Sequence, residues 1–317
     1  MAFKKKLHLY HPARTPVEVE ARHTKQRLRR EKADPQSLER GVRQLLANKT
    51  GGTMAGIWLL IPEYLRLGVW DLLRSWSGAS EGEVQSRLAL QLVNESALCV
   101  SGMRHSRTLG HKGFELANGL PFLATDTAIH CLLDNRSVAE AQRLQVALGK
   151  IRQTYGHFRG RLLAIDPHRI TSYSKRHMVL RKTHRTDSRA TKLAQSFFCL
   201  DADTQQPVCF ITGTSSRTIT QATQQLLSLS ADILKIQDDG KPLIMADTEH
   251  YTAELFDWVS AHSPFDMLVP MPYSSAVKRA IGQLCGDSFQ RHWAGYATAR
   301  GSYRFRGNNG GPYHQII

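Results

Sequence analysis

Two short apolar segments of the chain each run directly into an aspartate. The first, 161–166, reads Arg-Leu-Leu-Ala-Ile-Asp between a glycine and a proline, and the second, 242–247, reads Pro-Leu-Ile-Met-Ala-Asp. A short continuous apolar run bounded by turn-forming residues is typical of a strand that is buried on both faces of a sheet. We therefore expect two strands that end in Asp166 and Asp247 at the rim of a sheet.

This pair of aspartates outlines a divalent-metal site. If the two strands are neighbours, the carboxylates of Asp166 and Asp247 lie close together, and two carboxylates at that separation repel each other unless a cation lies between them. For either aspartate taken alone, the alternative is a cap on the turn that follows its strand.

The net charge of the chain favours a polyanionic partner. The 317 residues include 42 Lys+Arg against 27 Asp+Glu, which gives a formal charge of +15 at pH 7. An excess of this size indicates nucleic acid rather than a pocket for acidic substrates. The length suggests about two domains.

The cysteines and the apolar segments bear on the compartment. Five cysteines form no CxxC pair, and their odd number argues against a disulfide framework, so we expect buried thiols in a reducing, cytoplasmic compartment. The N-terminus lacks the apolar core of a secretory signal, and no apolar stretch approaches the roughly 20 residues that span a bilayer. A membrane role is therefore not expected.

Three regions follow from the pattern along the chain. Residues 1–34 form a basic arm that is either simply solvated or lies on phosphates, and these two interpretations are compatible. Residues 35–156 have helical periodicity, including a helix at 65–76 and another that begins near residue 80. Such a helix pair resembles a helix-turn-helix DNA reader, although ordinary helical hairpins have the same pattern. Residues 157–317 then form the predicted catalytic domain.

Helix starts are marked by recognisable capping sequences. Ser137 and Glu140 fit a capping box before a helix that extends to about residue 155. Thr252 is a plausible N-cap for a later helix, and Tyr251 and Phe256 are spaced for a hydrophobic staple.

A strongly basic segment follows the first aspartate. The residues that we expect to contact DNA phosphates all lie in or beside it: Arg169, Lys175, Arg176, Arg181, Lys182 and Arg185. Placed beside a carboxylate pair, this charge would draw a phosphate backbone toward a metal. The alternative is a solvated hairpin edge that lysines and arginines protect from association.

The order of elements in the second half predicts the fold. Strands at 193–200 and 207–213 flank a polar turn that contains Asp201 and Asp203, which either supply turn chemistry or, as the alternative, ligate a metal. A helix at 218–234, the Asp247 strand, a further helix and a strand at 265–269 complete the series. Three antiparallel strands followed by a helical crossover to a parallel neighbour are the ribonuclease-H-like arrangement. We therefore expect an α/β fold, a ribonuclease-H-like mixed sheet preceded by an all-α N-terminal region.

The chain resembles the DDE transposases of bacterial insertion sequences, and the segment from Ala246-Asp247 to Glu254-Leu255 carries the resemblance around the second aspartate. It implies that Asp166 and Asp247 are catalytic and hold Mg²⁺ or Mn²⁺ for phosphodiester cleavage and strand transfer. It also implies double-stranded DNA as partner, both element ends and target, and a homodimer in the DNA complex. The alternatives are a catalytically defective DNA-binding fragment and a ribonuclease-H-like nuclease outside transposition.

The third acid of such families has no obvious counterpart. It is usually a glutamate on a later helix, and no glutamate follows Glu254 in this sequence. One explanation is that the catalytic domain is incomplete at residue 317, because 307–312 reads as a loop. The other is that Glu249 or Glu254 is the third ligand.

Overall fold

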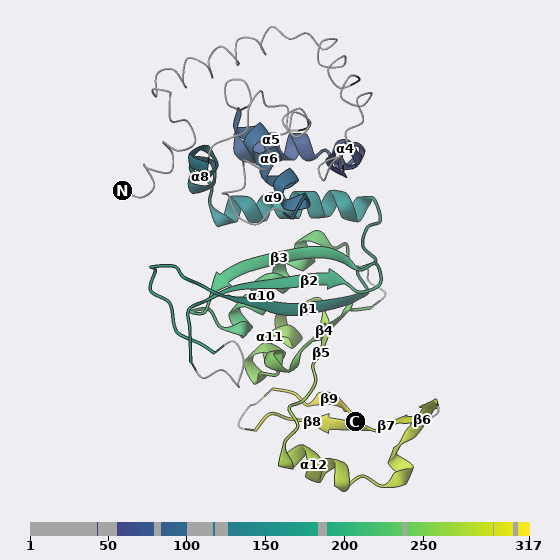
Figure 1. The fold of residues 1–317 in the computed structure, drawn as a ribbon. Coiled ribbons are helices and arrows are strands. Elements are labelled where there is room, and N and C mark those ends of the chain that lie inside the picture. Colours follow the sequence, from purple (N-terminus) through teal and green to yellow (C-terminus); the bar gives the residue numbers. More distant parts are fainter. Residues whose placement is uncertain are drawn as a thin grey trace. The chain divides into compact units, whose positions relative to one another are not determined.

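The computed structural model describes residues 43, 56–78, 84–99, 117, 126–182, 189–236, 240–293, 295–306 and 310–317 (Figure 1). Contacts divide the chain into two units, 1–144 and 145–317. The expected basic arm at 1–34 lies outside the described residues. Within them, no helix has the length and apolar character needed to cross a membrane.

The described part of the first unit is helical, as expected. Its helices are α4 (Gly56–Arg66), α5 (Val69–Ser77), α6 (Val84–Ala97), α8 (Asp126–Asp134) and the first part of α9 (Val138–Thr154). α5 and α6 pack against each other, Leu73 and Leu88 on them are buried, and the buried hydroxyls of Ser77 and Ser86 are 2.9 Å apart. A DNA-reading role for these helices stays a prediction.

The second unit is built on a five-stranded sheet. Its strands are β1 (Leu162–Thr171), β2 (Leu193–Asp201), β3 (Gln206–Thr214), β4 (Leu243–Ala246) and β5 (Asp266–Leu268). The order across the sheet is β3-β2-β1-β4-β5; β1 is antiparallel to β2 and parallel to β4, and β5 is parallel to β4. This is the expected ribonuclease-H-like arrangement, and the predicted fold class is confirmed.

The helices of this unit begin where the sequence indicates. Helix α10 (Ile219–Ile233) connects β3 to β4, and α11 (Ala253–His262) connects β4 to β5. The hydroxyl of Thr252 accepts a hydrogen bond from the Leu255 amide at 3.3 Å, and the ring centroids of Tyr251 and Phe256 are 6.1 Å apart in an edge-to-face contact. Thus both the predicted N-cap and the predicted staple of α11 are present.

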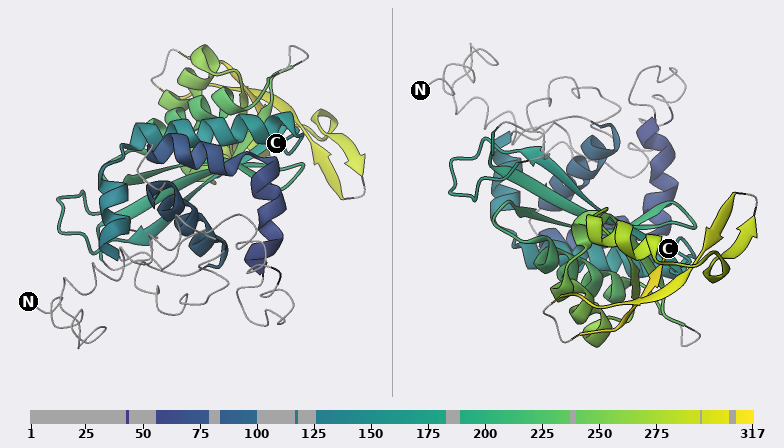
Figure 2. Two further views of the ribbon diagram at one scale, coloured as in Figure 1. Left: turned by 90° about the horizontal axis from the view of Figure 1, so that it is seen from above. Right: turned by 90° about the horizontal axis from the view of Figure 1, so that it is seen from below.

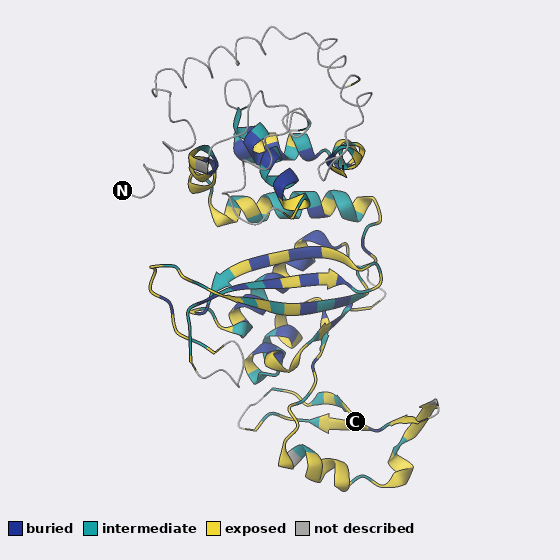
Figure 3. Ribbon diagram, in the orientation of Figure 1, coloured by how far each residue is buried: buried dark blue, intermediate teal, exposed yellow. Residues whose placement is uncertain are grey.

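One face of the sheet forms the core with α10 and α11, which lie behind the strands in Figure 1. Leu163 of β1 and Ile244 of β4 are fully buried there against Leu226 of α10 and Leu255 of α11. Along β1 to β3, buried and exposed residues alternate (Figure 3). The second face of the sheet therefore carries the exposed set.

β1 is longer than the sequence predicted. We expected the strand to end at Asp166, but it continues through Pro167 to Thr171, so that expectation is wrong. β4 ends at Ala246, opposite Ile165, and the backbone groups of odd-numbered β1 residues face the β4 side. The backbone nitrogen of Pro167 faces the β4 side at a point beyond the end of β4. Its missing N–H therefore leaves no hydrogen bond between strands unmade, and the pairing of β1 with β2 is not interrupted.

The C-terminal part adds α12 (Ser275–Gly282) and two small antiparallel sheets: β6 (Gln290–Trp293) with β7 (Tyr296–Thr298), and β8 (Arg300–Tyr303) with β9 (Tyr313–Ile316). These elements are the yellow-green and yellow segments of Figure 2. The expected loop at 307–312 is thus followed by a paired strand.

All five cysteines are free thiols, but the expectation that they are buried holds only for Cys199 and Cys209. Cys99, Cys131 and Cys285 are exposed.

Asp201 fixes the entry to β1. Its buried carboxylate accepts hydrogen bonds from the amides of Arg159 (2.8 Å), Gly160 (2.7 Å) and Thr204 (2.9 Å). Burial raises its pKa, but the amide hydrogen bonds outweigh that effect and hold the pKa of Asp201 below its usual value. Turn chemistry therefore accounts for this aspartate.

Replacing Asp201 tests that role. In Asp201→Asn one carboxylate oxygen becomes an amide nitrogen that cannot accept these bonds, so we expect the free energy of unfolding to fall by about 2 to 3 kcal/mol at neutral pH. A group with a depressed pKa in the folded state contributes stability above its unfolded pKa of about 3.9 and loses it as pH falls through the folded pKa. Urea unfolding should show the difference shrinking below about pH 4. The control is Asp203→Asn in the same turn, which should cost less than about 1 kcal/mol because its ion pair with Arg161 is at the surface.

Candidate active site

The parallel register of β1 and β4 brings the two sequence-predicted aspartates together. Ile165 lies opposite Ala246, so the next residue on each strand is Asp166 and Asp247. Asp166 is exposed, and the side chain of Asp247 is 45% exposed. β4 ends here while β1 continues to Thr171, so the two carboxylates lie side by side at the end of β4, called the rim below, and are open to solvent.

Asp247 is held in place by the turn that follows it. Its Oδ1 accepts a hydrogen bond from the Glu249 amide at 3.1 Å and lies 2.7 Å from Nδ1 of His250. The His250 ring is almost fully buried at 1% exposure, so it is a fixed partner. Asp247 therefore caps the 3₁₀ turn Thr248–His250, as the alternative interpretation of this aspartate expected. Within the described residues, no hydrogen bond engages its Oδ2.

An arginine lies beside the aspartates. The guanidinium of Arg169 donates to both oxygens of Glu249, through Nη1 at 2.9 Å and through Nη2, and its Nε donates to Gln195 at 3.2 Å. The bond to Glu249 raises the pKa of Arg169 despite partial burial, and the charges of Asp247 and Asp166 act in the same direction. Arg169, which we expected to contact DNA, is thus the ion-pair partner of Glu249 in this structure.

The other predicted DNA contacts lie in the β1–β2 connection. Lys175, Arg176 and Lys182 are exposed, whereas Arg185 lies outside the described residues. The Arg181 backbone forms an isolated bridge with Thr191. Their role in DNA binding stays a prediction.

The candidates for a third acid are differently placed. Glu249 is in the ion pair with Arg169, and Glu254 is exposed in the first turn of α11. Asp257 accepts a hydrogen bond from the Tyr313 hydroxyl. In the described part of the chain, no three His, Cys, Asp or Glu residues are grouped as a metal site.

The donor chemistry of the aspartate pair fits a hard divalent cation. Mg²⁺ is commonly bound through one or two carboxylates, with water and substrate phosphates completing its coordination. Asp166 and Asp247 supply two carboxylates at one solvent-open rim, and His250 orients the second, as outer-shell partners of metal ligands do.

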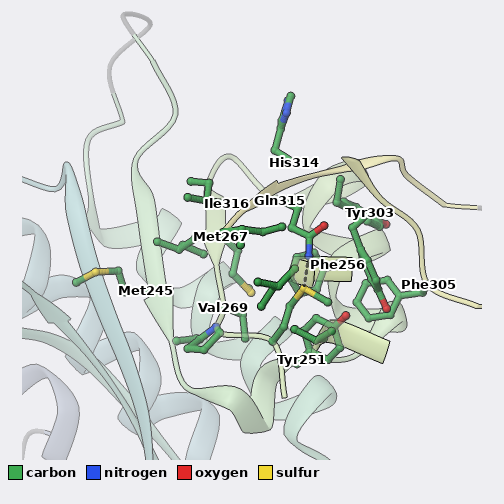
Figure 4. Close-up of a pocket in the computed structure, with 18 residues that line it drawn as sticks. Met245, Tyr251, Phe256, Met267, Val269, Tyr303, Phe305, His314, Gln315 and Ile316 are labelled. Carbon is green, nitrogen blue, oxygen red and sulfur yellow. Dashed lines mark hydrogen bonds between the residues drawn. The ribbon is translucent and has the colours of Figure 1, made fainter. Parts of the chain in front are cut away.

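A separate apolar cavity lies near this rim (Figure 4). It has a volume of about 650 Å³, and its walls come from β4, β5, α11, α12 and the C-terminal strands. On one side of the cavity, the ring centroids of Tyr251 and Phe305 are 4.9 Å apart, and burial raises the pKa of Tyr251. None of the residues that line it is acidic, so Asp166 and Asp247 lie outside this cavity.

Three solved structures show a limited likeness to this chain. They are a Mos1 transposase paired-end complex with left transposon end, a Mos1 mariner paired-end complex with Mn and a Mos1 strand transfer complex, with identities of 11%, 12% and 13%. Each match covers 65% of this chain and 73%, 74% and 67% of the respective Mos1 chain, with a TM-score of 0.24. A TM-score of 0.24 is too low to support the fold assignment, which therefore rests on the strand order of the sheet. No protein-family model and no curated protein matches the sequence.

Sequence reasoning did not assign roles to His250 or to the Arg169–Glu249 pair. His250 had a local signal, because it stands three residues after an aspartate that ends a strand, within reach of that carboxylate across one turn. The ion pair joins residues 80 positions apart and has no local signal.

The His250 contact predicts an effect on metal affinity. His250→Leu removes the donor to Asp247, so its carboxylate is less fixed and Mn²⁺ binding should weaken about 10- to 100-fold. His250→Asn keeps an N–H donor near the position of Nδ1 and should bind within a few-fold of the wild type. Calorimetric titration with Mn²⁺ measures both, and circular dichroism checks folding. Unchanged affinity in a folded leucine variant would contradict the assignment.

Proposed function

We propose that this protein is a metal-dependent DNA transposase that cleaves phosphodiester bonds and transfers strands at the ends of an insertion sequence. The observation that supports this most directly is the β1–β4 register, which brings Asp166 and Asp247 to one exposed rim. The formal charge of +15 and the exposed lysines and arginines of the β1–β2 connection favour a DNA partner.

In this proposal Asp166 and Asp247 hold the divalent cations, Mg²⁺ or Mn²⁺. When bound, such ions activate the attacking water or 3′ hydroxyl and stabilise the leaving oxygen. His250 keeps Oδ1 of Asp247 in a fixed position, and the following turn holds it there through the Glu249 amide. The basic connection after β1 supplies phosphate contacts that align the DNA with the two carboxylates.

A second function, DNA binding without catalysis, is favoured by one specific observation. Glu249, two residues after Asp247, is engaged in a bidentate ion pair with Arg169, and no third ligand is grouped with the aspartates among the described residues. A copy of the enzyme that has lost its chemistry would still occupy element ends through its basic surfaces.

Strand cleavage separates these functions. With supercoiled plasmid and Mg²⁺ or Mn²⁺, we expect nicking that chelation abolishes, and Asp166→Asn and Asp247→Asn should each reduce its rate at least about 100-fold because each loses a metal ligand. Asp203→Asn, which changes an acid away from the rim, is the matched control and should keep the wild-type rate. Cleavage that survives both rim substitutions would remove the proposed site. DNA binding without cleavage by the wild type would favour the second function.

A further inference from the structure

Two aromatic rings lie in the same cross-strand row as the first aspartate. In the register of the sheet, Asp166 of β1 is directly opposite Phe198 of β2, and Phe198 is directly opposite Phe210 of β3. Directly opposed residues project from the same face of a sheet. The two rings are 5.9 Å apart at their centroids with planes inclined by 30°, and the phenylalanines are 37% and 48% exposed.

The rows on either side of these rings differ in character. On one side, Leu200, Met245 and Leu268 are 39%, 37% and 45% exposed. On the other side, the register aligns His168, Ser196 and Thr212, which carry polar groups. The open face thus changes from apolar to polar across the row that contains Asp166.

We propose that Phe198 and Phe210 form a stacking platform for unpaired nucleotides of the DNA strand that is cut at Asp166. This inference rests on the proposed function and adds to it the state of the substrate, a strand whose bases next to the scissile phosphate are exposed. Aromatic side chains on an open sheet face stack on bases, whereas the faces of bases inside a duplex are already stacked on each other.

Two further observations favour a nucleic-acid strand over a protein partner on this face. The ring row is continuous with the candidate cleavage site, because Phe198 is the direct cross-strand neighbour of Asp166. The excess positive charge of the chain, +15, complements a phosphate backbone. A strand whose bases lie on the rings can place its phosphates along the polar row and at the aspartates.

Binding without metal tests the platform separately from cleavage. The probes are one fluorescent DNA duplex with blunt ends and the same duplex with a four-nucleotide single-stranded overhang that contains 2-aminopurine. The wild type should bind the overhang form more tightly and quench the 2-aminopurine. Phe198→Ala and Phe210→Ala should each weaken overhang binding roughly 5- to 150-fold, the range for loss of one stacked base, and leave blunt-duplex binding nearly unchanged.

Substitutions of graded chemistry exclude a simple folding effect. Phe198→Trp keeps a ring and should retain both affinity and quenching, whereas Phe198→Leu keeps apolar area and should lose the quenching. Tyr296→Ala removes a ring that is 64% exposed elsewhere in the same unit and should behave as the wild type.

The outcomes distinguish the platform from the chemistry. Equal binding of the two probes by the wild type, or equal losses on both probes in the alanine variants, would overturn the platform even if the plasmid is nicked. Selective loss of overhang binding supports the platform even if no cleavage is found, in which case only the proposed catalysis fails. Capture of a protein by this face, with no preference for the overhang, would likewise overturn it.

Discussion

The candidate site depends on one constraint, the parallel pairing of β1 with β4 in a single register. Leu163 and Ile244 are opposite each other and fully buried against the helices, and this burial fixes the register. A slip by one residue on either strand would turn its buried side chains toward solvent. Transfer of side chains of this size to water costs about 1.5 to 3 kcal/mol each. The adjacency of Asp166 and Asp247 is therefore a consequence of core packing three residues away on each strand, and no attraction between the carboxylates is needed to produce it.

Two neighbouring carboxylates still repel each other, and the structure shows how the folded chain tolerates this. His250 and the Glu249 amide donate toward Oδ1 of Asp247, and the Arg169 guanidinium adds a positive charge close to both aspartates. Arg169 is itself fixed by Glu249 and Gln195. Since Arg169 lies directly opposite the buried Gln195, it projects from the helix-covered face, whereas Asp166 projects from the open face, so the arginine acts on Asp166 only through its charge.

How much of this the sequence could predict follows from how local each signal is. The strand order, the N-caps Ser137 and Thr252 and the approach of the two aspartates depend on apolar runs and capping residues within about ten positions, and the structure contains them. The continuation of β1 past Pro167 could not be foreseen, because it depends on where a distant partner strand ends. The ion pair of Arg169 with Glu249 was hidden for the same reason. Residue type alone placed Arg169 among the phosphate contacts, and only the fold shows that a carboxylate already binds it.

The pleat of the sheet links the acid pair to the aromatic row. Residues of β1 alternate between the helix-covered face and the open face, so the burial of Ile165 requires Asp166 to project from the open one. The partners of Asp166 on β2 and β3 are then set by register, and a β-bulge follows one pair beyond this row, between Cys199 and Leu200. The bulge inserts an extra residue on β3, so Val208 and Cys209 are both buried, but Phe198 and Phe210 remain opposed. Since the irregularity lies outside the row, the rings and the carboxylate keep one common face, and a strand bound at Asp166 meets the rings directly.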